Sequence, residues 1–152
     1  MALPNIFSKE VADEIIARIN SLTPSTPALW GKMNVAQMLA HCNVTYEMLY
    51  TDKHKKASGF LKFILKVIVK PAVTNEKPYP KSTKTAPAFI ITDERVFNDE
   101  KSRLIDYINK VQSEGAAAFE GRESLSFGPL TSIGWNNLFY KHLNHHLSQF
   151  GA

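Results

Sequence analysis

Cysteine is nearly absent from this chain of 152 residues, which contains only Cys42. An intrachain disulfide is therefore excluded, and a single cysteine suits a reducing compartment, so we expect a cytoplasmic protein. The first residues, MALPNIF, have neither a basic segment nor a long apolar run, and no signal peptide is expected. No stretch has the length and hydrophobicity of a membrane span, so no stable membrane insertion is expected.

A strong charge imbalance is also lacking, because 18 lysines and arginines face 14 aspartates and glutamates and give a formal net charge of +4. The excess is concentrated in the middle third, at Lys53, Lys55, Lys56, Lys62, Lys66, Lys70, Lys77, Lys81 and Lys84. Aromatic residues do not alternate with these lysines, as a stacking platform for bases would require, so no nucleic acid is predicted as a partner. A solvated face is the favoured interpretation, and an acidic partner or a lipid headgroup is the alternative.

Several catalytic motifs are missing as well. The chain has no glycine-rich phosphate loop, no Cys-x-x-Cys pair and no serine nucleophile elbow. The metalloprotease motif His-Glu-x-x-His is also absent, because Leu143 follows His142.

What is present is an ordinary globular composition, with 44% hydrophobic and 21% charged residues. This length fits one domain over residues 1–152, and such a domain buries enough surface to fold without disulfides.

The apolar periodicity predicts an all-α fold, a helix bundle with long loops. Helices are expected over about residues 8–20, 35–50, 59–70, 98–115 and 131–151, with Ser8 and Asn34 as N-caps and Pro71 as a terminator. Residues 73–96 and 120–130 are expected to be loops, with 88–91 extended against the bundle. Loops as long as the first often border a site.

The predicted helix at 59–70 is apolar apart from Lys62, Lys66 and Lys70, which recur at steps of four. The favoured interpretation is a buried bundle helix whose lysines face outward. A dimer interface is the second interpretation, and a helix lying on a membrane surface is the third.

The last predicted helix carries histidines on its apolar face. Trp135, Phe139, His142, His146 and Gln149 are spaced by four, three, four and three, so they share one side of the helix. Two histidines at i and i+4 can reach one ion at the metal–nitrogen distance of about 2.0–2.1 Å. Without an ion, two adjacent buried imidazoles are hard to satisfy.

His41 lies on an inner seam of the helix predicted at 35–50, and facing helices of a bundle bring such side chains together. Three histidine ligands leave coordination positions open, as in catalytic sites. We therefore predict that His41, His142 and His146 bind one divalent ion. The alternative is that the three are core histidines bonded to backbone carbonyls or hydroxyls. Imidazole suits several metals, so zinc or nickel is expected first, with iron or manganese also open.

Other polar or reactive side chains are expected to be secondary. Cys42 is predicted to be a small core residue, His54 to be solvated, and His145 to lie on the flank of the histidine face. Gln149 either supports His146 or merely packs. Trp30 and Trp135 are expected in the core or in the wall of a pocket.

Two segments resemble a known group of proteins. Residues 30–41, WGKMNVAQMLAH, resemble the second-helix signature of the DinB-like (DinB/YfiT) superfamily, whose members are classed as metalloenzymes. Residues 142–149, HLNHHLSQ, resemble its closing helix. The segment FGPL at 127–130, together with Trp135 and the final Phe150-Gly151, is similar to a subgroup with no assigned function. Ile133-Gly134 departs from the pattern, since acidic residues often precede this tryptophan.

The resemblance implies an up-down-down-up four-helix bundle, with one extra short helix allowed, and a metal site formed by His41, His142 and His146 but not His145. It also implies a homodimer. Some members are metal-dependent hydrolases or thiol S-transferases, so an enzyme acting on a small-molecule substrate is one expectation, although fold alone does not fix the reaction. The alternative is a non-catalytic bundle that dimerises or binds a partner or lipid surface through the lysine-rich third helix.

Overall fold

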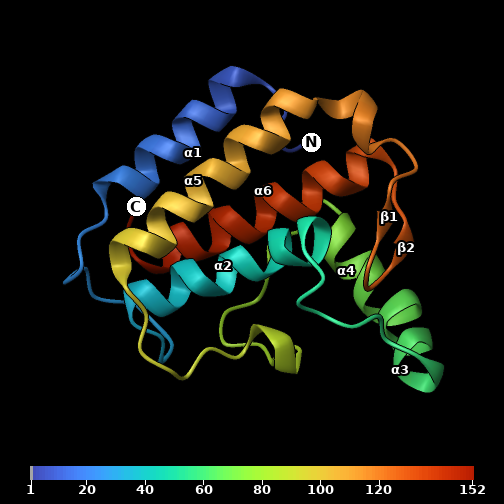
Figure 1. The fold of residues 1–152 in the computed structure, drawn as a ribbon, viewed down its shortest axis with the longest axis horizontal. Helices are drawn as coiled ribbons and strands as arrows, with labels where there is room; N and C mark the ends of the chain where they lie inside the picture. The colour runs from blue at the N-terminus through green and yellow to red at the C-terminus, as the bar shows by residue number, and fades with distance from the viewer. Residues whose placement is uncertain (1) are drawn as a thin grey trace.

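The computed structural model describes residues 2–152 and is predominantly helical (Figure 1). The four longest helices are α1 (Lys9–Ser21), α2 (Val35–Tyr50), α5 (Phe97–Glu114) and α6 (Ser132–Gln149). A shorter helical segment consists of α3 (Gly59–Ile64), the π-helix η1 (Leu65–Val69) and α4 (Lys70–Thr74). Two 3-10 helices, η2 (Pro87–Phe89) and η3 (Ala116–Phe119), and an antiparallel pair of strands, β1 (Glu123–Ser124) and β2 (Gly128–Pro129), complete the described elements.

Side-chain caps determine where three of the long helices begin. Ser8 Oγ accepts from the backbone N–H of Val11, and Thr131 Oγ1 accepts from that of Gly134. Asn34 and Gln37 form a reciprocal capping box, with N···O distances of 2.9 and 3.0 Å. Each cap satisfies N–H groups of a first turn that have no partner within the helix, so the predicted N-caps Ser8 and Asn34 are confirmed.

The four long helices pack around one core. α5 contacts α1 and α2, and α6 contacts the same two helices (Figure 1). Their largest fully buried aliphatic side chains are Ile15, Ile19, Met38, Leu39, Leu104, Ile108, Leu143 and Leu147. None of the helices within residues 2–152 has the length and continuous apolar surface needed to traverse a lipid bilayer.

Hydrogen bonds show the relative directions of these helices. The N-terminal ends of α1 and α6 are joined by Ile6 N–H donating to Asn136 Oδ1, and Arg18 near the end of α1 donates to Asn144. α1 and α6 therefore run in the same direction. On the other side, Asn43 donates to Glu100 and Arg103 donates to Glu47, so α2 and α5 also run parallel to each other.

The helix predicted to end at Pro71 continues to Thr74, so that boundary was wrong. The wider π-helical turn of η1 precedes α4, and Pro71 falls in the first turn of α4. Proline is tolerated there because first-turn N–H groups have no acceptor within the helix.

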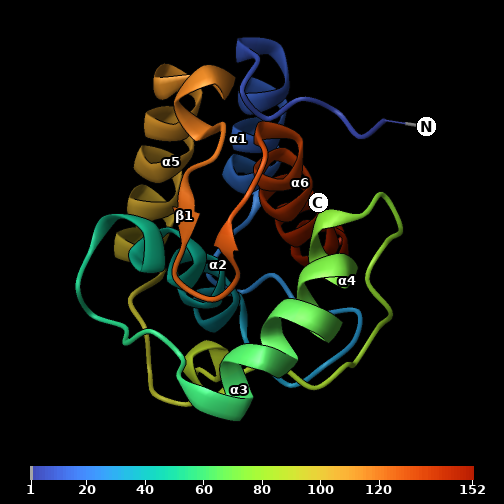
Figure 2. The same ribbon diagram turned by 90° about the vertical axis from the view of Figure 1, so that its right-hand side faces the viewer.

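The predicted burial of this segment was also wrong. Phe60 is 76% exposed and Ile68 is 65% exposed, whereas Lys70 Nζ donates to the carbonyl of Pro129 at 3.1 Å. The apolar side chains that face solvent are Phe60, Leu61, Phe63, Val67 and Ile68. The four long helices already cover one another's apolar faces, so α3 lies at the edge of the molecule (Figure 2).

The predicted loops are largely confirmed. Residues 75–96 contain only η2, which replaces the extended piece expected at 88–91 and contacts α2. Residues 120–130 contain the short strand pair, whose register pairs Glu123 with Pro129.

Candidate metal centre

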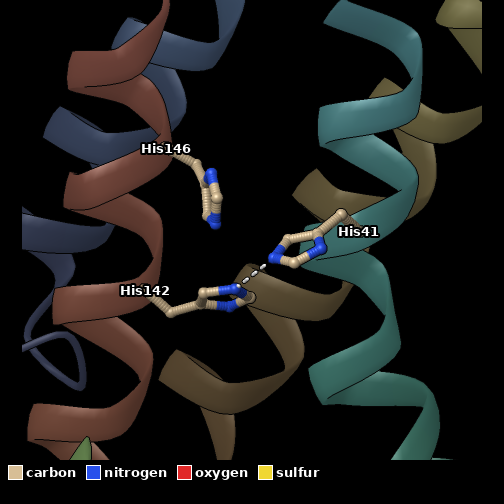
Figure 3. Close-up of side chains that lie close together, drawn as sticks. All are labelled: His41, His142 and His146. Atoms are coloured by element: carbon tan, nitrogen blue, oxygen red, sulfur yellow. Dashed lines mark hydrogen bonds between the residues drawn. The ribbon is translucent and has the colours of Figure 1, made fainter. Parts of the chain in front are cut away.

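Three histidine rings meet between α2 and α6. Because these helices are antiparallel neighbours, His41 of α2 faces both His142 and His146, which lie one turn apart on α6 (Figure 3). One ring nitrogen from each residue lies within 4.8 Å of the others, and the Nε2 atoms of His41 and His142 are 3.0 Å apart. Two nitrogens bound tetrahedrally to one ion at about 2.0–2.1 Å lie about 3.3 Å apart, close to the spacing of the His41–His142 pair, so the cluster is close enough to bind a metal ion.

The outer nitrogen of each ring has a partner of its own. His41 Nδ1 donates to the carbonyl oxygen of Phe89 at 2.7 Å. His146 Nδ1 lies 2.7 Å from Gln149 Oε1, and His142 Nδ1 shares a 3.1 Å hydrogen bond with Thr45 Oγ1. Such outer bonds fix ring orientation in metal sites, and they leave the three Nε2 atoms pointing inward.

These partners determine the protonation of two rings. A carbonyl can only accept, so the neutral ring of His41 carries its proton on Nδ1 and has a lone pair on Nε2. Gln149 Nε2 donates to the carbonyl of Trp30 at 2.7 Å, which turns its Oε1 toward His146. His146 therefore also presents a lone pair on Nε2, the form that a metal ion requires.

Burial keeps the cluster uncharged. It lowers the pKa of His146 to about 3, with a further contribution from His41. It also lowers the pKa of His41, and it lowers that of His142 well below the usual value, assisted by the neighbouring histidines. His41 and His146 are buried, while His142 keeps some surface facing a cavity. All three imidazoles are therefore neutral near pH 7, which is the charge state that metal ligation requires.

Gly31 makes the support of His146 possible. Its φ angle is +85°, a conformation that favours glycine, and a Cβ atom there would lie 2.5 Å from Gln149 Nε2. Glycine thus allows Gln149 to reach the carbonyl of the preceding Trp30.

A large cavity opens beside the cluster. Its volume is about 1320 Å³, and the histidines form part of its wall together with α3, η1, the 79–92 loop and the 124–127 turn. Its wall is mainly apolar, and no aspartate or glutamate within residues 2–152 lines it. The predicted role of the long loop as the border of a site is in agreement with this arrangement.

The other candidate residues fall into three environments. Cys42 is a buried core residue, as expected, and burial raises its pKa. His145 lies outside the cluster but lines the cavity, with its ring centroid 5.0 Å from that of His146. His54 was expected in solvent, but its Nε2 lies 2.9 Å from Glu47 Oε2, because the lysine-rich turn folds back onto the end of α2.

Some supporting groups were not predicted. Thr45 lies one turn beyond His41 on the same seam, so helical spacing could have identified it. The carbonyls of Phe89 and Trp30 could not be found in this way, because backbone groups give no sequence signal. Gln149, for which two roles were open, bonds to His146.

The donor set fits a divalent ion. Three neutral nitrogen donors from facing helices, each held from behind, meet beside an apolar cavity that a ligand can enter. Three protein nitrogens leave positions for further ligands, as catalytic sites require.

Comparison with known proteins identifies a family whose description names no activity. A family model described as "Protein of unknown function (DUF1569)" matches residues 7–152. No curated protein and no solved structure matches the chain.

Proposed function

Since this chain belongs to the DUF1569 family, whose description states no function, we propose from the site itself that it is a divalent-metal-binding protein with His41, His142 and His146 as ligands. The observation that carries the proposal is the convergence of three Nε2 atoms whose rings are each held by an outer hydrogen bond. Three neutral imidazole ligands suit zinc, nickel, iron and manganese, so the ligand type does not identify the metal.

We further propose that the fold is the up-down-down-up four-helix bundle of the DinB/YfiT superfamily. Support comes from the parallel pairs α1–α6 and α2–α5, and from the position of the histidines on α2 and α6. The short α3–α4 segment would be an addition to that bundle.

The proposed activity is that of a metal-dependent hydrolase or thiol S-transferase acting on a small molecule in the cavity. When bound, a divalent ion supplies Lewis-acid chemistry, which polarises a carbonyl or lowers the pKa of a water or thiol. Phe89, Thr45 and Gln149 hold the ligand rings in place, and the mainly apolar wall surrounds the space beside them. His145 lines the cavity beside the cluster, and because burial and Lys81 lower its pKa, it is a neutral ring that can accept a proton.

A second candidate is a non-catalytic protein that uses the α3–η1 surface to dimerise or to bind a lipid surface. Five large apolar side chains are exposed there, and Lys62 and Lys66 stand between them in the sequence. Monomeric proteins rarely expose a large contiguous apolar patch without a function.

Metal binding by untagged protein tests the first proposal. Chelator-treated protein should bind one zinc per chain, and the melting temperature should rise, because an ion that binds only the folded state stabilises it by about 2.7 kcal/mol at 100 times its Kd. His142→Ala should lose this binding, while the neighbouring His145→Ala should keep it. Wild-type protein that binds no zinc, nickel, iron or manganese would refute the metal site.

A further inference from the structure

The cavity beside the histidines has two ends of different chemistry. Along antiparallel α2 and α6, Trp30 and Gln149 lie at one end, the histidine cluster follows, and Met48 lies at the other end, where its Sδ is 3.9 Å from Ser126 Oγ. The order of these contacts makes the cavity an elongated one, with the histidine cluster between its ends.

The end near Met48 is apolar. The inner face of the α3–η1 segment contributes Ile64, Leu65 and Val69, and the turn between the strands contributes Leu125 and Phe127. Lys70 donates to the carbonyls of Phe127 and Pro129, which holds η1 and α4 against this turn. The α3–η1 segment is therefore a roof with one apolar face toward the cavity and another toward solvent.

The end near Trp30 is polar and basic. Lys32 and Lys84 line the cavity there, together with the hydroxyl groups of residues 82, 83 and 85. Lys81 Nζ lies 4.3 Å from the Trp30 ring centroid, which places this loop beside that end. Since no carboxylate within residues 2–152 lines the cavity, its charge suits an anion and disfavours a cation.

We propose that this cavity binds an elongated anionic amphiphile, an acyl chain with a carboxylate-like head. The chain lies between Leu65 and Phe127, and the head lies at the histidines and the basic end. The placement of the head rests on the proposed metal function, whereas the placement of the chain does not. The volume of about 1320 Å³ exceeds the roughly 300–1,000 Å³ of common small-molecule pockets. An apolar wall of this extent favours an apolar occupant over water.

Intrinsic fluorescence reports binding directly, because both tryptophans of the chain line the cavity. Metal-free protein is titrated with dodecanoate, hexanoate and dodecyltrimethylammonium, each below its critical micelle concentration. Dodecanoate should bind with saturation. Hexanoate should bind at least about 100-fold more weakly, because burying one methylene strengthens binding about threefold to fourfold. The cationic amphiphile should bind more weakly than dodecanoate, and equal binding would refute the anionic head.

A pair of variants on one helix locates the chain. Leu65→Lys places a charge in the roof of the cavity and should weaken dodecanoate binding at least tenfold, with zinc binding retained. Ile68→Lys, on the solvent face of the same π-helix, should leave dodecanoate binding and zinc binding unchanged. If Ile68→Lys weakens binding and Leu65→Lys does not, the chain binds the outer surface and the cavity proposal is wrong.

Measuring zinc binding and dodecanoate binding in the same protein distinguishes failure of this proposal from failure of the proposed metal function. Zinc binding without dodecanoate binding would refute the amphiphile and leave the metal site standing. Dodecanoate binding without zinc binding would refute the metal site and leave the binding of the acyl chain in the cavity standing. If both hold, zinc should tighten dodecanoate binding in wild-type protein and not in His142→Ala.

Discussion

The outer hydrogen-bond partners of the three histidines are of two kinds. The partners of His41 and His146 are amide carbonyl oxygens, which can only accept, so these two rings have one usable tautomer. The Thr45 hydroxyl can donate or accept, so His142 can adopt either tautomer. In the structure the Nε2 atoms of His41 and His142 are within hydrogen-bond distance, which requires a proton on His142 Nε2. Metal binding requires that proton on Nδ1, and Thr45 accommodates the change.

Thr45 therefore provides a test at the scale of one hydroxyl. Thr45→Val keeps the shape but leaves His142 Nδ1–H without an acceptor, and zinc affinity should fall about 10-fold or more, as for other outer partners of metal ligands. Thr45→Ser keeps the hydroxyl and should bind as the wild type does. Competition with a fluorescent zinc chelator measures both, and equal affinities for Val and Ser would show that the hydroxyl is not needed.

Glu47 predicts a dependence of stability on pH. Burial opposes its ionisation, but hydrogen bonds from His54 and Arg103, together with Lys53, lower its pKa below the usual 4.5. The folded state thus binds this proton less readily than the unfolded state. The carboxylate stabilises the protein above pH 4.5, and this contribution is lost as the pH falls through the lowered pKa.

The expected result is that Glu47→Gln lowers the free energy of unfolding by about 1–3 kcal/mol at pH 7, as for a hydrogen-bonded charge that is removed. The difference from wild type should shrink below pH 4.5. Urea denaturation at several pH values measures it. The exposed Glu10→Gln should change stability by less than about 0.5 kcal/mol at any pH, and a constant difference for Glu47→Gln would contradict the assignment.

At the scale of elements, a buried lysine helps to fasten α4 to α6, together with Asn137, whose Nδ2 donates to the carbonyl of Thr74 at 2.8 Å. Lys141 is only 4% exposed, and its Nζ donates to the carbonyls of Ala72 and Asn75 at 2.7 and 2.9 Å and to Asn75 Oδ1 at 2.9 Å. Burial lowers its pKa to about 8. The last carbonyls of α4 lack partners within the helix, so Lys141 acts as a C-terminal cap from a neighbouring helix.

Replacing Lys141 with methionine should leave these acceptors unpaired and cost about 1–3 kcal/mol of stability. Hydrogen exchange in α4 should also become faster than in the wild type, because the roof segment loses part of its attachment to α6. Lys9→Met removes an exposed lysine paired with Asp13 and should cost less than about 1 kcal/mol. Equal losses in the two variants would show that Lys141 does not fasten α4.

At the scale of the whole molecule, the α3–η1 surface is the main departure from an ordinary monomer. We propose that a second copy of the chain covers it, in accord with the homodimer that the resemblance implies. Light scattering should give a dimer for the wild type at micromolar concentration, and Phe63→Glu should give a monomer with the same circular dichroism. Ile133 is also apolar and 70% exposed, but lies on α6, and Ile133→Glu should stay dimeric. A monomeric wild type at all concentrations would refute the dimer.

Features that depend on residues close together in the sequence could be predicted, whereas most features that depend on distant residues could not. The caps Ser8 and Asn34, the limits of α2 and the shared face of His142 and His146 were predictable, because turns and caps join residues three or four apart. Histidine convergence across α2 and α6 also followed from bundle packing. The burial predicted for residues 59–70 was wrong, because the apolar content of a helix does not show whether a neighbouring element is available to cover it.

The sequence by itself determined the helices, the seams and the three imidazoles, since these depend on local spacing and side-chain type. Only the tertiary structure decided that the carbonyl of Phe89 holds His41, that Gln149 bridges His146 to Trp30, and that α3–η1 roofs a cavity rather than filling a core. The physical reason is that Phe89 and Trp30 accept through backbone carbonyls and lie 48 and 119 positions from the side chains that they bind, so no local pattern in the chain encodes these contacts.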